Sequence, residues 1–296
     1  MSAADLDAAA SLPSDGPSAA SVARRERLRL LVRSKTFLVG AVIVGFWVLC
    51  AILGPTLVPH DPLAIELLGK LQGPSGAHWF GTDQLGRDVF SRVIVGARDI
   101  LIVAPLATLL GTVLGAALGL VTGYFRGAID DVLSRVIDAF LAVPVVIVGL
   151  LALVALGPSR VTVIAVIGIV FTPIIARTVR AAVLSERELD YVAAARLRNE
   201  RAPYILFVEI LPNVAAPILV EFTVRLGYAI FAIATLSFLG FGIQPPSPDW
   251  GLQIFENYSL ISGGFWWTTL FPALAIASLV VGVNLISDGV NQVFER

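Results

Sequence analysis

Six long apolar runs, separated by short polar or glycine- and proline-rich stretches, divide the chain. The first run, residues 37–58, is ended by Pro59, Asp61 and Pro62. An α-helix needs roughly 20 mostly apolar residues to cross the hydrocarbon core of a bilayer. The pattern therefore predicts six transmembrane helices, at residues 37–58, 100–121, 137–156, 161–175, 218–241 and 265–286.

The runs are continuous rather than alternating, which favours helices over the strands of a membrane barrel. Residues 157–160 form the whole link between the third and fourth runs, so these two helices are expected to form an antiparallel hairpin. The predicted fold class is an all-α polytopic membrane protein.

Composition supports this fold class. Of 296 residues, 57% are hydrophobic and 15% are charged, whereas an ordinary soluble domain has about 45–50% apolar and about 25% charged residues. The formal net charge of −1 gives no support for nucleic-acid binding. Little chain is left for a large soluble catalytic domain beside the spans.

Several kinds of site are not supported by the sequence. Cys50 is the single cysteine, so the chain cannot form an internal disulfide. Lys70 follows Gly69 but lacks the Ser or Thr that comes next in a phosphate-binding loop, and Lys35 has no glycine-rich approach. His60 and His78 are too far apart in sequence for the paired-histidine helix face of a zinc hydrolase. We predict no catalytic residue, no metal and no cofactor in this chain.

Basic residues give the predicted orientation. Fifteen Lys and Arg lie on the side of the N-terminus and five on the other side. The excess of positive charge in cytoplasmic segments predicts that both termini are cytoplasmic. The predicted divisions are a disordered basic segment 1–35, helix 36–58, an external loop 59–97 and a core of 98–290.

Two of the connections between predicted helices of the core are long. Residues 177–212, predicted to be cytoplasmic, contain an alanine-rich helix with charged flanks, and residues 242–264 form an external loop. A short helix of this kind suits a groove in another protein, although a solvated loop would have the same composition.

Three motifs stand out in the chain. Residues 190–196 read DYVAAAR and are followed by ILPN at 210–213. Residues 80–92 read FGTDQLGRDVFSR, and residues 237–242 read SFLGFG. These motifs resemble those of permease subunits of ABC transporters in the peptide-importer branch, specifically the C-type subunit of dipeptide and oligopeptide permeases. Asn199 stands where the family usually has glycine, and Asn is the residue after glycine that best tolerates positive φ.

The resemblance implies one permease subunit of an importer in the plasma (inner) membrane. Its implied partners are a second permease subunit in a heterodimer, two ATP-binding subunits or one fused ATPase, an external substrate-binding protein and membrane lipid. ATP and Mg²⁺ would belong to the ATPase. The implied coupling-loop residues are Asp190, Tyr191, Val192, Ala193, Ala194, Ala195, Arg196, Leu197, Asn199, Leu211 and Pro212.

Candidate path residues are Glu221, Arg225 and Ser237. Glu221 and Arg225 are four residues apart, so they can pair on one helix face. They either meet substrate at the inner end of the path or form a clamp at the membrane interface.

A second set is expected to dock the binding protein, the alternative being a structural cover over the outer mouth. Trp250 is also expected in an aromatic belt at the outer interface. The docking set comprises Asp83, Arg87, Asp88, Arg92, Pro245, Pro246, Asp249 and Trp250.

Glycines recur every fourth residue at Gly111, Gly115, Gly119 and Gly123. They predict a smooth strip where another helix packs closely.

Other functions stay open at this point. The same architecture could import haem, glutathione or a nickel chelate, and the sequence does not identify the solute. A stand-alone secondary transporter or channel would need no partner, but no internal repeat is evident. An intramembrane enzyme would need paired catalytic groups within the spans, and none is suggested.

Overall fold

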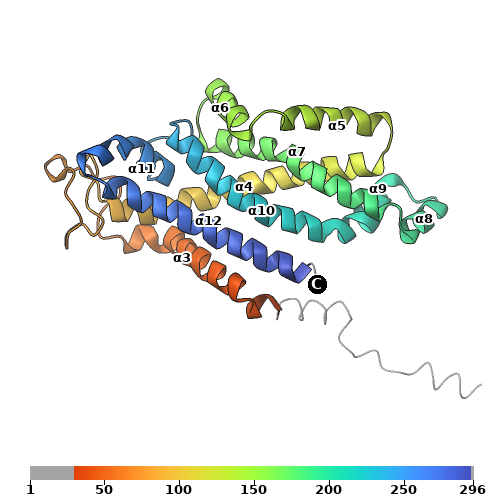
Figure 1. Cartoon of the computed structure of the whole chain (residues 1–296), viewed down its shortest axis with the longest axis horizontal. Helices are drawn as coiled ribbons and strands as arrows, with labels where there is room; N and C mark the ends of the chain where they lie inside the picture. The colour runs from red at the N-terminus through yellow and green to blue at the C-terminus, as the bar shows by residue number, and fades with distance from the viewer. Residues whose placement is uncertain (1–29, 295–296) are drawn as a thin grey trace, which may run out of the picture.

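The computed structural model describes residues 30–294, a bundle of long helices (Figure 1). Among these residues no strand is assigned, and Thr82 and Asp88 form one isolated β-bridge. The long helices are α3 (Lys35–Leu57), α4 (Val89–Tyr124), α7 (Arg160–Glu186), α10 (Leu211–Phe238) and α12 (Trp267–Phe294).

Five segments are long and apolar enough to cross a membrane, and a bent pair of helices supplies a sixth candidate. This agrees with the predicted number, but one predicted span is not continuous. In place of one helix at 137–156, α5 (Ala128–Leu141) meets α6 (Val145–Leu156) at 88°. Pro144 precedes α6, and a proline disfavours helical backbone at the residue before it, which breaks the helix.

The predicted glycine strip is confirmed by the packing of α4 against α7. A Cβ atom added at Gly115 would lie 2.7 Å from the Cβ of Ile175, and one at Gly119 would lie 2.7 Å from the Cβ of Val179. Real Cβ atoms essentially never approach so closely. The absence of side chains therefore allows the two helices to come into backbone contact along four turns.

Several predicted boundaries move. The first span, predicted at 36–58, matches α3, but the external loop ends earlier than residue 97 because α4 already begins at Val89. Residues 30–33 are helical, so the predicted disorder is wrong there, whereas residues 1–29 lie outside the described residues. Residues 242–264 contain α11 (Trp250–Asn257) and the 3₁₀ segment η3 (Tyr258–Gly263).

Short elements gather at the two ends of the bundle (Figure 1). One end carries the loop between α3 and α4, with its 3₁₀ turn η1 (Leu67–Gly69), and also α11. The other end carries α8 (Asp190–Leu197) and α9 (Ala202–Tyr204), followed by the π-helical segment η2 (Ile205–Ile210). The two long predicted connections therefore lie at opposite ends of the molecule.

Candidate functional site

The short helix α8 has two distinct faces. Val192 and Ala195 are fully buried against the bundle. Asp190, Ala193, Ala194 and Leu197 are exposed, and Leu197 keeps 85% of its surface accessible. Their spacing of three and four residues places them on one side of the helix. The outward face is thus small and apolar, with one acidic residue at its beginning.

Contacts with neighbouring helices hold α8 in place. The hydroxyl of Tyr191 donates a hydrogen bond of 2.6 Å to Glu186 of α7. Burial, together with this carboxylate, raises the pKa of Tyr191 to about 12. Arg187 donates a 2.6 Å hydrogen bond to the carbonyl oxygen of Tyr124 at the end of α4, and the guanidinium of Arg196 lies 5.4 Å from the Tyr124 ring centroid. Tyr191 therefore bonds α8 to α7, Arg196 of α8 contacts the end of α4, and Arg187 joins the ends of α4 and α7 beside it.

The turn after α8 confirms what the sequence predicted for Asn199. This residue has φ of 55°, in the left-handed region, and the next backbone amide, from Glu200, donates to the carbonyl of Ala195. Asparagine therefore takes the place of glycine at a helix end. Leu211 and Pro212 begin α10, which continues directly from the π-helical segment η2, and Pro212 supplies no backbone N–H to that helix.

Glu221 and Arg225 form the ion pair that their spacing predicted. The Nε atom of Arg225 lies 2.6 Å from Oε1 of Glu221, and the guanidinium lies 5.2 Å from the ring centroid of Tyr228. Tyr228 also lines a cavity of about 430 Å³ between α10 and α12, with Asn284 and Asp288 on its far wall. This polar cavity begins beside the ion pair.

Ser237 does not belong with these path residues. Its side chain is 1% exposed, and its hydroxyl accepts a hydrogen bond of 3.2 Å from the backbone amide of Ile243. Ser237 is buried where it holds the turn after α10, and it lines neither the cavity beside Tyr228 nor the larger one between α3, α4 and α10, which argues against the predicted path role.

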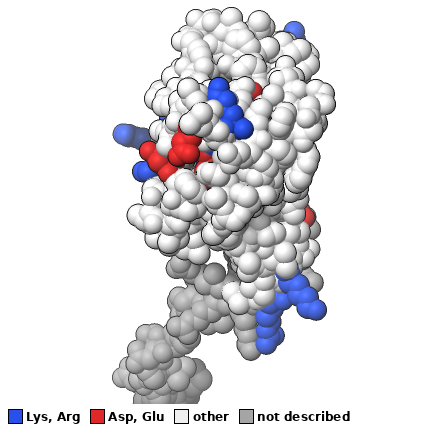
Figure 2. Space-filling view, turned by 90° about the vertical axis from the view of Figure 1, so that its left-hand side faces the viewer, with Lys and Arg blue, Asp and Glu red and all other residues white. Residues whose placement is uncertain are grey.

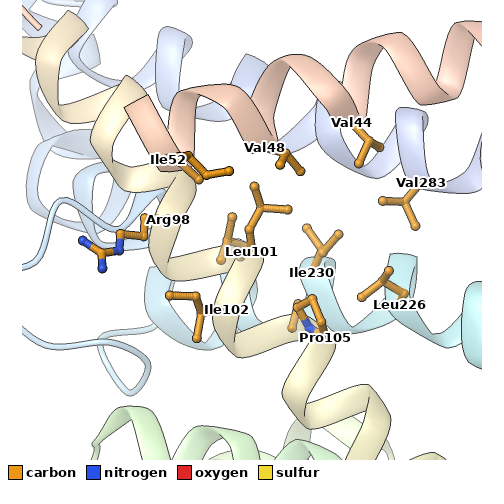
Figure 3. Close-up of a pocket in the computed structure, with 13 residues that line it drawn as sticks. Val44, Val48, Ile52, Arg98, Leu101, Ile102, Pro105, Leu226, Ile230 and Val283 are labelled. Atoms are coloured by element: carbon orange, nitrogen blue, oxygen red, sulfur yellow. The ribbon is translucent and has the colours of Figure 1, made fainter. Parts of the chain in front are cut away.

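A larger cavity, of about 580 Å³, lies between α3, α4 and α10 (Figure 3). Arg98 is its one charged lining residue, and the remaining lining is apolar. Apart from Arg98, this lining has no side chain that could hydrogen-bond to a peptide backbone. It suits a lipid chain or a helix of another subunit.

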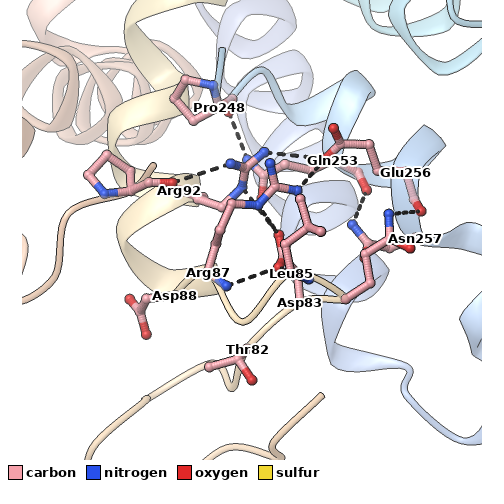
Figure 4. Close-up of polar contacts among 12 residues, drawn as sticks. Thr82, Asp83, Leu85, Arg87, Asp88, Arg92, Pro248, Gln253, Glu256 and Asn257 are labelled. Carbon is pink, nitrogen blue, oxygen red and sulfur yellow. Dashed lines mark hydrogen bonds and ion pairs between the residues drawn. The ribbon is translucent and has the colours of Figure 1, made fainter. Parts of the chain in front are cut away.

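At the opposite end, four of the predicted docking residues belong to the interior (Figure 4). Arg87 bridges Asp83 and Glu256, with 2.6 Å to a carboxylate oxygen of each. Arg92 donates to the carbonyl oxygen of Pro62 at 3.2 Å. Asp83, Arg87, Asp88 and Arg92 are at most 5% exposed. They join the loop after α3 to α11 and leave no side chain for a docked protein.

Asp249 and Trp250 are also buried, which corrects both the docking and the aromatic-belt predictions. Trp250 is 0% exposed, and its indole nitrogen donates to the carbonyl oxygen of Val93 at 2.7 Å. Asp249 caps α11 by accepting from the backbone amide of Leu252, and complete burial raises its pKa to about 6. Pro245 and Pro246 are the members of the docking set that are exposed.

The surface of this end is mostly uncharged (Figure 2). That appearance agrees with the burial of its arginines and aspartates.

Sequence reasoning missed one cluster altogether. The chain has two histidines, and His60 and His78 meet with ring centroids 4.6 Å apart. Their spacing of 18 residues predicted no contact. The one signal available was that both belong to the same predicted loop.

Comparisons with known proteins agree with the resemblance. The family model described as the binding-protein-dependent transport system inner membrane component matches residues 115–296. A second model, the N-terminal TM domain of oligopeptide transport permease C, matches residues 24–74.

Individual relatives extend over nearly the whole chain. A dipeptide transport system permease protein of Alkalihalophilus pseudofirmus is 38% identical over 92% of this chain and 89% of its own length. Its counterpart in Bacillus subtilis is 36% identical over 90% of this chain and 83% of its own. A glutathione transport system permease protein of Pectobacterium atrosepticum is 33% identical over 91% of this chain and 87% of its own.

Proposed function

The chain belongs to the family of binding-protein-dependent transport system inner membrane components, and from this premise we propose that peptides are the solute it carries. It is a permease subunit of an ABC importer, with the helical membrane fold of that family. The support for peptides is the similarity to dipeptide permeases over most of both chains. We place it in the inner membrane, with α8 at the cytoplasmic end.

Glutathione is the second candidate, because a glutathione permease shares 33% identity with this chain. The two are distinguished by reconstituting the assembled importer in proteoliposomes with its binding protein. Labelled dipeptide, longer peptide and glutathione are offered separately, with ATP inside or withheld. ATP-dependent uptake of di- or oligopeptides is expected. Uptake of glutathione alone, or uptake without ATP, would contradict the proposal.

The second part of the proposal concerns the partner of α8. An exposed apolar face on a helix that is hydrogen-bonded to α7 and contacts the end of α4 is suited to a groove in a cytoplasmic ATPase subunit. Two such subunits, or one fused ATPase, would bind ATP and Mg²⁺ and move α8 between two states. A ligand-driven change of this kind requires contacts that differ between the states. The firm attachment of α8 would pass that movement to the long helices.

This coupling role is tested by Ala194→Arg, which places a long charged side chain on the exposed face. Ser185→Arg makes a similar change at an exposed residue of α7 at the same end of the bundle. We expect Ala194→Arg to remove co-purifying ATPase and ATP-driven uptake while the chain still folds. Normal assembly and uptake in Ala194→Arg would show that α8 has another role.

A crosslink gives an independent readout. Because Cys50 is the single cysteine, Leu197→Cys in a Cys50→Ser background carries one thiol on the outward face. We expect it to crosslink to the ATPase subunit.

The remaining partners follow from the same assembly. A second permease subunit would complete the path, and an external binding protein would meet the end that carries α11. The exposed Pro245 and Pro246 are the residues of the original docking set that keep this role.

The path itself is assigned to the polar cavity beside Arg225. The Nη atoms of Arg225 make no hydrogen bond with any other described residue, so they are free for a peptide carboxylate.

A further inference from the structure

Two histidines and one aspartate from separate segments meet at the end of the bundle that carries α11. His60 follows the end of α3, His78 lies in the loop, and Asp88 is the N-cap of α4. Nδ1 of His78 lies 2.9 Å from Oδ1 of Asp88, and Nδ1 of His60 lies 3.9 Å from the same oxygen. One ligand atom of each residue lies within 4.8 Å of the others.

The carboxylate of Asp88 has no arginine or lysine partner in the described part of the chain. Oδ2 accepts hydrogen bonds from the backbone amide and the hydroxyl of Ser91, at 2.8 and 2.7 Å. The guanidinium groups of Arg87 and Arg92 bind other acceptors, and neither forms an ion pair with the carboxylate of Asp88 (Figure 4). A carboxylate that is 3% exposed is costly to bury without a compensating positive charge.

The carboxylate of Asp88 is hydrogen-bonded by Ser91, and its Oδ1 lies within hydrogen-bonding distance of Nδ1 of His78, whereas His60 has an unsatisfied group. Its Nδ1 atom is buried and makes no hydrogen bond, although 36% of the side chain is exposed. His78, by contrast, is held firmly, because its carbonyl oxygen accepts from the amides of Ser75 and Gly81. Two imidazole groups and a carboxylate oxygen therefore lie close together, and no Lys or Arg among the described residues pairs with that carboxylate.

We propose that His60, His78 and Asp88 bind a divalent transition-metal ion of the Zn²⁺ type, with a remaining coordination position open to water. Imidazole nitrogen and carboxylate oxygen are common zinc ligands, bound at about 2.0–2.2 Å, which places tetrahedral ligands about 3.3–3.6 Å apart. The observed separations of 2.9 and 3.9 Å lie on either side of that spacing. Ser91 acts behind the ligands by fixing the orientation of the carboxylate.

The ion would join three segments that are separated in the sequence. It would tie the chain after α3 to the turn at 75–81 and to the first turn of α4. This stabilises the end of the bundle assigned to the external side, and it does so independently of the solute carried.

The test uses the full chain in lipid nanodiscs, purified without a histidine tag and treated with a chelator. ZnCl₂ is titrated by calorimetry, and bound zinc is counted by mass spectrometry after gel filtration. Selective ¹⁵N-histidine labelling adds a direct readout, because the chain has two histidines. We expect one zinc per chain, with both imidazole signals shifted.

Two variants examine the ligands. His60→Gln removes a proposed ligand whose side chain makes no hydrogen bond among the described residues, so the fold should persist. Asp88→Asn keeps a side-chain oxygen that can accept from the Ser91 amide at the N-terminus of α4. Each should weaken zinc binding by about tenfold or more. Asp61→Asn, an exposed neighbour with the same charge change, should bind like the wild type.

Two results would overturn the proposal. One is equal zinc binding by the wild type and His60→Gln, which would place any bound zinc elsewhere. The other is no stoichiometric zinc in the wild type, with an imidazolium signal showing that a proton supplies the charge beside Asp88. If Asp88→Asn does not fold, His60→Gln decides between these outcomes.

Discussion

The indole nitrogen of Trp250 donates a hydrogen bond of 2.7 Å to the carbonyl oxygen of Val93, joining the first turn of α11 to α4 across 157 residues of sequence. The Trp250 ring also packs edge to face on Trp47 of α3, with centroids 4.7 Å apart. Trp47 in turn donates to the hydroxyl of Ser278 in α12 at 2.9 Å. The two tryptophans thus connect four helices near one end of the bundle.

Replacing Trp250 with Phe should destabilise the chain. Phenylalanine keeps an aromatic ring against Trp47 but loses the hydrogen bond and part of the buried surface, so we expect a loss of about 1–3 kcal/mol in the free energy of unfolding. Thermal unfolding in detergent, followed by circular dichroism, measures it. Trp266→Phe is the control, because Trp266 is 48% exposed. An equal effect at both positions would contradict the structural role of Trp250.

Asp249 should make stability depend on pH. Burial raises its pKa to about 6 from an ordinary value of 3.8. The folded state therefore binds the proton more tightly than the unfolded state, so this contribution is fully present below pH 3.8 and is lost as pH rises through 6. It amounts to about 3 kcal/mol at most.

Asp249→Asn isolates this contribution. Asparagine keeps an oxygen for the amide of Leu252 but does not ionise. The difference in stability between wild type and variant should therefore shift in favour of the variant between pH 4 and pH 7. A difference that does not change with pH would show that Asp249 keeps an ordinary pKa.

The close approach of α4 and α7 makes Gly119 sensitive to a single methyl group. Alanine is the better helix former, by about 1 kcal/mol. Its Cβ, however, would lie 2.7 Å from Cβ of Val179 and 2.8 Å from the carbonyl oxygen of Ala176. We expect Gly119→Ala to lower the free energy of unfolding by about 1–3 kcal/mol, as overpacking does.

Ala117→Leu is the matched control, since Ala117 is exposed on the same helix. Detergent melting curves of both variants measure the comparison. Unchanged or increased stability in Gly119→Ala would mean that helix propensity outweighs the contact.

Features that depend on local pattern were predictable from the sequence. The length of the first apolar run predicted α3, and the four-residue spacing of Glu221 and Arg225 predicted their ion pair. The glycine repeat of α4 predicted its close contact with α7. The bend before α6 was not predicted, because the apolar run at 137–156 continues across Pro144, where the helix breaks.

Features that depend on distant partners were not predictable. The charged residues of the GTDQLGRD segment, residues 81–88, were predicted to lie on the surface because charged residues are usually exposed. Glu256, which pairs with Arg87, lies 169 residues away and carries no sequence signal of that contact. The meeting of His60 and His78 likewise depends on how the loop folds over α4.

Exchanging the charges of Glu221 and Arg225 tests whether the pair is structural or contacts the solute. Removing one partner, as in Glu221→Gln, leaves Arg225 uncompensated at membrane depth, so we expect a loss of about 3 kcal/mol, the low end for a buried pair. The double exchange, Glu221→Arg with Arg225→Glu, restores an ion pair at the same spacing and should recover most of that stability. Peptide uptake by the reconstituted importer should nevertheless stay low, because the guanidinium no longer lies beside Tyr228 at the mouth of the polar cavity. Arg225→Lys, which keeps the charge at its own position, should retain more uptake than the exchange. Full uptake by the exchanged chain would instead assign the pair to an interfacial clamp, and the path would then lie elsewhere in the bundle.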